Sequence, residues 1–147
     1  EMTGKTNIPD TSQSLPIALL RAREKVMKPA RLLLSNAGVT EQQWRVVRVL
    51  VEEGPMDPTT IADRAVLLLP SLTRILQKLE EKGFITRTRD EQDGRRQVIK
   101  ATSDGCRLIA DNIPAAKSYA GKLRDHLGTE RYEQLLELLN DLNKIDL

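Results

Sequence analysis

Residues 58–101, PTTIADRAVLLLPSLTRILQKLEEKGFITRTRDEQDGRRQVIKA, decide the fold of this chain. Their first part predicts a short helix over Pro58–Ala65, because Asp57 can cap it and proline suits a first helical turn. A second helix is expected over about Leu69–Lys82, where apolar residues recur at helical spacing until Gly83 ends the pattern.

After Gly83 the pattern changes from helical spacing to alternation. Apolar and polar residues alternate over 84–89 and again over 96–101, and the polar stretch Glu91–Gly94 separates the two runs. This arrangement predicts a two-stranded hairpin with a glycine-containing loop. Two helices joined by a short turn and followed by a basic hairpin have the proportions of a helix-turn-helix with a wing.

Further helices are predicted on both sides of this region. In front of it, one helix runs over about Pro16–Leu34 with a kink at Pro29, and another begins at Thr40 and continues to Glu53. Behind it, two helices begin near residues 102 and 129, and the first of them is expected to bend at Pro114 and Gly121.

The predicted fold class is therefore mainly α with a small β-hairpin wing, a winged helix-turn-helix with N- and C-terminal dimerisation helices. We expect residues 1–15 to form a flexible arm and 16–147 a single domain. Within it, the winged core is expected at about 40–102 and the dimerisation helices at about 16–35 and 103–147. A second copy would bury the leucine-rich stripes of these end helices, although packing on their own core is the alternative.

Composition narrows the function classes. Residues 70–100 hold eight Lys/Arg against five Asp/Glu, whereas the remainder holds 15 against 16, so the positive excess lies in one region. The single histidine, His126, argues against a transition-metal site, and no cofactor is expected. The chain has no Cys/His pair, phosphate-cradling glycine loop or interpretable carboxylate pair, so we expect neither catalytic residues nor an enzyme.

The single cysteine, Cys106, excludes an internal disulfide. We expect it to be a small buried residue, and a redox-sensing role is the alternative. No apolar stretch approaches the roughly 20 residues that span a bilayer, and no secretory pattern opens the chain. We therefore expect a cytoplasmic protein without a membrane partner.

The outward face of the 69–82 helix is rich in hydrogen-bonding groups that suit base edges and phosphates in a DNA major groove. These residues are Ser71, Thr73, Arg74, Gln77 and Lys78. At the hairpin tip, Arg95 and Arg96 are placed to enter a narrow minor groove. The alternative is that these charges form an ordinary solvated face.

The motifs IADRA (61–65), SLTRIL (71–76), LEEKGFITR (79–87) and DGRRQVIKAT (93–102) resemble the MarR family, the multiple-antibiotic-resistance regulators. The resemblance implies a dimeric winged-helix regulator that binds a pseudo-palindromic operator in double-stranded DNA. It makes Arg95 the wing arginine and Asp93 its orienting partner. The chain departs from the family at Leu67–Pro70, where a polar cap and small hydroxyl residues are common, and at Ala101, where leucine is usual.

Within the family, SLPIALLRARE (14–24), TEQQWR (40–45), Met56-Asp57 and PSLT (70–73) resemble the regulators of homoprotocatechuate degradation. The resemblance implies a homodimeric repressor of an aromatic-acid catabolic operon, relieved by a small aromatic carboxylate. Guanidinium groups and an aromatic wall suit such a ligand, and the candidates are Arg21, Arg23, Trp44 and Arg45. The alternatives are that Trp44 is plain core, that no effector exists, or that Cys106 carries a redox response.

Overall fold

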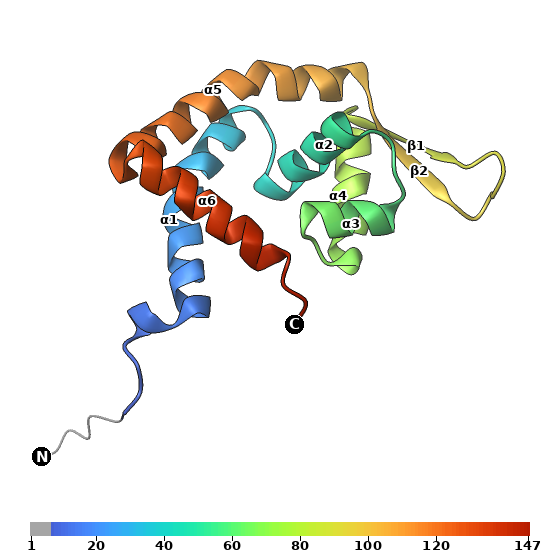
Figure 1. The fold of residues 1–147 in the computed structure, drawn as a ribbon. Coiled ribbons are helices and arrows are strands. Elements are labelled where there is room, and N and C mark those ends of the chain that lie inside the picture. The colour runs from blue at the N-terminus through green and yellow to red at the C-terminus, as the bar shows by residue number, and fades with distance from the viewer. Residues whose placement is uncertain (1–6) are drawn as a thin grey trace, which may run out of the picture. The chain divides into compact units, whose positions relative to one another are not determined.

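The computed structural model describes residues 7–147 (Figure 1). The chain divides into two units between Thr40 and Glu41. The first unit holds a 3-10 helix, η1 (Thr11–Gln13), and α1 (Leu15–Asn36). The Ser14 hydroxyl caps α1 by accepting from the backbone N–H of Ile17 at 3.5 Å. Pro29 lies inside α1, and the helix continues through it. The predicted domain boundaries stay a prediction.

Part of the stretch that is predicted as a flexible arm forms helical turns. Residues 1–6 of that arm lie outside the described residues, whereas residues 11–13 form η1 and α1 begins at Leu15. Asp10 caps η1, because its side chain accepts from the backbone N–H of Ser12 at 3.4 Å. Two polar residues of this stretch, Asp10 and Ser14, therefore act as helix caps.

The second unit contains the predicted winged helix-turn-helix, and the fold class is confirmed. Its elements are α2 (Glu41–Glu53), α3 (Pro58–Ala65), α4 (Leu69–Glu81), β1 (Ile85–Arg89), β2 (Gln97–Ala101), α5 (Ser103–Leu127) and α6 (Thr129–Asn143). The two strands pair antiparallel with Arg87 opposite Ile99. Met56 adds an isolated bridge, because its N–H donates to the Ile99 carbonyl at 3.1 Å and its carbonyl accepts from Ile99 at 2.9 Å.

The core of this unit joins the three helices to the hairpin. α2, α3, α4 and β2 each contribute side chains without exposed surface, and these are Val46, Val47, Ile61, Leu72, Leu79 and Ile99. In α3 and α4, the apolar faces predicted from helical spacing are the faces that point inward. Burial of these aliphatic groups sets the orientation of α4 and therefore of its opposite, exposed face.

The turn between α3 and α4 has an unusual backbone. Val66 ends α3 in the left-handed region, with φ of 57°, where a β-branched residue is uncommon. Its neighbour Leu67 closes the turn by donating its N–H to the Ala62 carbonyl at 2.9 Å. Leu68 then occupies the N-cap of α4, where it has no side chain able to cap the helix.

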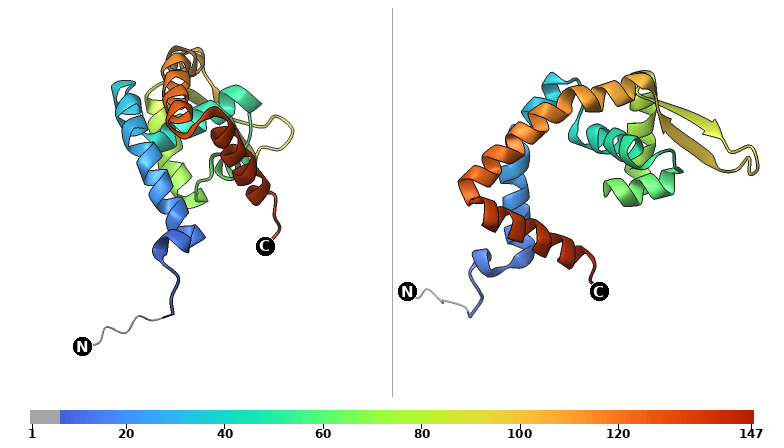
Figure 2. Two further views of the ribbon diagram at one scale, coloured as in Figure 1. Left: turned by 60° about the vertical axis from the view of Figure 1, so that its left-hand side comes forward. Right: turned by 45° about the horizontal axis from the view of Figure 1, so that its top comes forward.

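The last two helices carry few buried side chains. α5 runs through Pro114 and Gly121 as one helix, and only three residues of its first turns, Gly105, Leu108 and Ile109, are buried. Figure 2 shows that the chain turns between α5 and α6. Gly128 lies at this turn, as the C-cap of α5 and the N-cap of α6. α6 buries no residue, and neither does α1 in its own unit. None of the helices within residues 7–147 is long and apolar enough to cross a membrane.

The prediction that Cys106 is buried is wrong. Its side chain is exposed, because the buried face of α5 is formed by Gly105, Leu108 and Ile109, and residue 106 lies a quarter-turn away from it.

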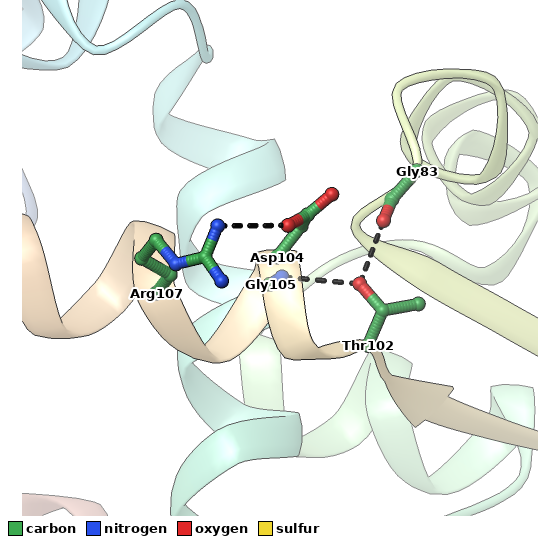
Figure 3. Close-up of polar contacts among 5 residues, drawn as sticks. All are labelled: Gly83, Thr102, Asp104, Gly105 and Arg107. Carbon is green, nitrogen blue, oxygen red and sulfur yellow. Dashed lines mark hydrogen bonds and ion pairs between the residues drawn. The ribbon is translucent and has the colours of Figure 1, made fainter.

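A polar junction ties the start of α5 to the end of α4 (Figure 3). The Thr102 hydroxyl donates to the Gly83 carbonyl at 2.6 Å and accepts from the Gly105 N–H at 3.1 Å. The Thr102 N–H also donates to the Phe84 carbonyl at 3.0 Å. One threonine therefore caps α5 and holds it against the segment that follows α4.

Candidate nucleic-acid interface

One face of α4 is polar and open to solvent. Leu72, Leu76 and Leu79 are buried, whereas the five predicted contact residues of the same helix are all exposed: Ser71, Thr73, Arg74, Gln77 and Lys78. Residues four apart are neighbours on a helix, so this face contains the rows Thr73–Gln77 and Arg74–Lys78. Lys78 also pairs with Glu81, at 3.8 Å between Nζ and Oε2, in an exposed contact that leaves it accessible to phosphate.

One ion pair and one hydrogen bond outside this face hold the C-terminal end of α4 in place. Arg87 of β1 binds Glu80 with 2.8 Å between Nη2 and Oε1, and Lys82 donates to the buried Gln43 of α2 at 2.9 Å. Sequence reasoning missed these partners because they lie seven and 39 residues apart. They orient α4 from both sides and leave its polar face unobstructed.

The loop of the hairpin is shaped by its own polar groups. Arg89 donates to the Gly94 carbonyl at 2.7 Å, and the Arg96 N–H donates to the Asp93 carbonyl at 2.9 Å. The Asp93 carboxylate accepts from the backbone N–H of Arg95 at 3.1 Å. Asp93 therefore shapes the turn that presents Arg95, whose side chain is exposed at the tip.

Arg96 is engaged with the helix-turn-helix. Its Nη2 lies 3.1 Å from Oδ2 of Asp57, and Oδ1 of the same carboxylate accepts from the Thr60 N–H at 2.8 Å. Hydrogen bonds from Thr60 and then from Arg96 lower the pKa of Asp57 from 3.8 to about 2. The Asp57 carboxylate therefore caps α3 and also binds Arg96, the residue before β2. Arg96 thus links the hairpin to the helix-turn-helix, and it is also a candidate DNA contact.

Replacing Asp57 should separate these two roles. Asp57→Ala is expected to lower the free energy of unfolding by about 1 kcal/mol, the usual cost of a lost N-cap. Asp57→Asn keeps a capping oxygen but loses the charge, so it should cost less at pH 7. Because folding depresses this pKa, its stabilisation is complete above pH 4 and is lost as the pH falls towards 2.

Urea unfolding at pH 7 and at pH 3 measures both effects. The Asn variant should lose less stability than the parent between the two pH values. Equal acid sensitivity of the parent and Asp57→Asn would contradict the role of this carboxylate.

The predicted effector residues lie in both units. Arg21 and Arg23 are on α1, where Arg21 donates to the Thr11 hydroxyl at 3.0 Å. Trp44 and Arg45 are on α2, and Trp44 is a core residue with 8% of its surface exposed. Arg45 is half-buried, and its Nε is buried without a hydrogen-bond partner among residues 7–147. The ligand role of these four residues stays a prediction.

Comparison with known proteins relates this arrangement to transcriptional regulators. The model of the MarR family matches residues 39–96. The chain is 38% identical to the HTH-type transcriptional regulator FarR of Neisseria gonorrhoeae, over 90% of this chain and 91% of that protein. It is 37% identical to the homoprotocatechuate degradative operon repressor of Escherichia coli, over 87% of this chain and 86% of that one.

The fold is also found in a solved structure. The crystal structure of NadR in complex with 4-hydroxyphenylacetate superposes with a TM-score of 0.80 at 34% identity, covering 99% of this chain and 100% of that one. The residues that match the family model include all of α2, α3, α4 and β1, which together build and orient the exposed polar face.

Proposed function

Because this chain belongs to the MarR family of transcriptional regulators, we propose that it is a homodimeric repressor that binds a pseudo-palindromic operator in double-stranded DNA. We place it in the cytoplasm, in control of an operon for aromatic-acid catabolism. A small aromatic carboxylate relieves the repression. The chain is a regulator and not an enzyme, like its relatives.

The polar face of α4 is the observation that carries the DNA-binding proposal. Two rows of exposed donors and acceptors stand on a helix whose opposite side is locked into the core. A helix of this kind fits a major groove, while an exposed arginine at the hairpin tip reaches the neighbouring minor groove. Arg74, Lys78 and Arg95 supply the positive charge for phosphate contacts.

The absence of buried residues in α1 and α6 supports dimerisation. α6 exposes Leu135, Leu136 and Leu138, and α1 exposes Leu19, Leu20 and Leu32. Apolar groups in such number are usually covered by another surface, and a second copy offers the same stripes to pair with. A two-fold dimer then places its recognition helices about one helical turn of DNA apart, roughly 34 Å.

Charge removal on the proposed DNA surface tests the function. Arg74→Ala and Lys78→Ala should weaken operator binding, and each lost phosphate contact should lower the slope of log K against log salt by about 1. Arg95→Ala should weaken binding on many sequences with less change in selectivity, because minor-groove readout is degenerate.

Operator fragments selected from the source genome provide the probe, and mobility shifts at several salt concentrations provide the measurement. Lys117→Ala removes an exposed cation from α5 and serves as the matched control. Folded Arg74 and Lys78 variants that bind as tightly as this control would show that the α4 face is not the DNA surface.

The effector proposal rests on the relatives and on one unsatisfied group. One relative is named for homoprotocatechuate degradation, and NadR was solved with 4-hydroxyphenylacetate. In this chain the buried Nε of Arg45 offers a charged donor that a carboxylate would satisfy. Trp44 is largely enclosed, so only its exposed edge is open to a ligand. The ligand relieves repression by favouring a spacing of the recognition helices that does not fit the grooves.

Titration with simple aryl carboxylates tests this part. Trp44 is the only tryptophan, so its fluorescence should change as the ligand binds, together with release of operator DNA. Arg45→Ala or Arg21→Ala should desensitise the protein at least about tenfold while operator affinity is kept. Absence of both signals at millimolar ligand would contradict an aryl-acid effector without affecting the repressor proposal.

A further inference from the structure

Three exposed apolar side chains lie in the turn before α4, the proposed recognition helix, and at its first residue. Val66 is 79% exposed, Leu68 is 76% exposed and Leu69 is 47% exposed. The core that holds α3 and α4 together leaves these three side chains outside. Their exposure sets them apart from Ile61, Leu72 and Leu76, which belong to the same two helices and are buried.

Leu69 continues the polar face of α4 towards its N-terminus. Residues 69, 73 and 77 follow one another at four-residue intervals, so Leu69 stands one turn before Thr73 on the same row. At roughly 1.5 Å per residue the row is about 12 Å long, the length of three to four base-pair steps. A helix that places Thr73 and Gln77 along base edges therefore brings Leu69 to the same groove.

The first turn of α4 is poorly suited to binding a phosphate. Pro70 has no N–H, and the N–H groups of Ser71 and Leu72 both donate to the Leu68 carbonyl, at 3.0 and 3.2 Å. Leu68 also provides no polar cap. An apolar partner fits this turn better than an anion does.

Within a major groove, the base edges offer one apolar group, the C5-methyl of thymine. We propose that Leu69 packs against a thymine methyl in each half-site and so selects thymine at that position. This inference rests on the proposed DNA-binding function, and it assigns a sequence preference to the first turn of α4, which has no capping side chain.

Deoxyuridine substitution tests the contact, because it removes the methyl group and leaves the base edge unchanged. Each thymine of the selected operator is replaced in turn, symmetrically in both half-sites. At one position the parent should lose about fourfold in affinity per half-site, the factor that corresponds to one buried methyl group. Leu69→Ala should bind the thymine operator more weakly and show no further loss with deoxyuridine there.

Leu69→Met keeps an apolar side chain and should retain the sensitivity to the methyl group. The proposal is overturned if every deoxyuridine operator binds the parent like the original, or if Leu69→Ala shows the same deoxyuridine penalty as the parent. A change of oligomeric state in Leu69→Ala without methyl sensitivity in the parent would also overturn it, by assigning this turn to a protein contact. A parent that selects no operator would instead contradict the proposed function itself.

Discussion

Gly105→Ala is expected to lower the free energy of unfolding by about 2–3 kcal/mol, the cost of forcing extra volume into a packed site. A Cβ on Gly105 would overlap the backbone carbonyl oxygen of Phe84 and would lie 3.3 Å from its carbonyl carbon. Both atoms belong to the backbone that connects α4 to β1, so the strain cannot be relieved by moving a flexible side chain.

The same substitution should also disturb the junction at Thr102. Moving α5 away from Phe84 stretches the bonds that Thr102 donates to the Gly83 carbonyl from its hydroxyl and to the Phe84 carbonyl from its N–H, at 2.6 and 3.0 Å. These bonds join the helix proposed for dimerisation to the end of the recognition helix. Operator affinity should therefore fall even at temperatures where the variant is folded.

Gly121→Ala is the matched control, because it lies in the same helix and an added Cβ meets no atom within 4 Å. Alanine in a helix interior is favoured over glycine, so this variant should gain up to about 1 kcal/mol. Thermal unfolding of both variants measures the contrast, which should be about 5–10 °C. Equal melting temperatures would show that α5 can move away from Phe84 without cost.

Leu135→Glu should dissociate the proposed dimer and weaken operator binding by at least about 100-fold. Leu135 is 44% exposed in the single chain, so a monomer would tolerate the change at little cost. In a dimer interface the same carboxylate would be buried without a partner, which costs several kcal/mol. A monomer would also be unable to bind both half-sites of one operator at the same time, so the gain in affinity from bivalent binding would disappear.

Gln134→Glu adds the same charge at the neighbouring exposed position and is the control. Sedimentation and operator binding, measured at equal protein concentration, separate the two variants. If the Leu135→Glu variant stays dimeric and binds the operator normally, α6 is not part of the dimer interface.

The sequence by itself determined the helices and strands of the winged core and the exposed face of α4. Pro58–Ala65 has the bounds that its cap and proline predict, because Asp57 and Pro58 act within one helical turn. The helical spacing of leucines in α4 determined which residues face outward, since burial selects the apolar side. Alternation over two short runs was sufficient to predict the hairpin.

Only the tertiary structure decided which residues of distant elements contact one another. Arg96 finds Asp57 across 39 residues, and the backbone of Phe84 leaves no room for a side chain at Gly105. Cys106 is exposed beside a glycine that is buried. Spacing along a chain determines which side of an element is apolar, but the contacts between distant elements follow from how their side chains interlock once that side is buried.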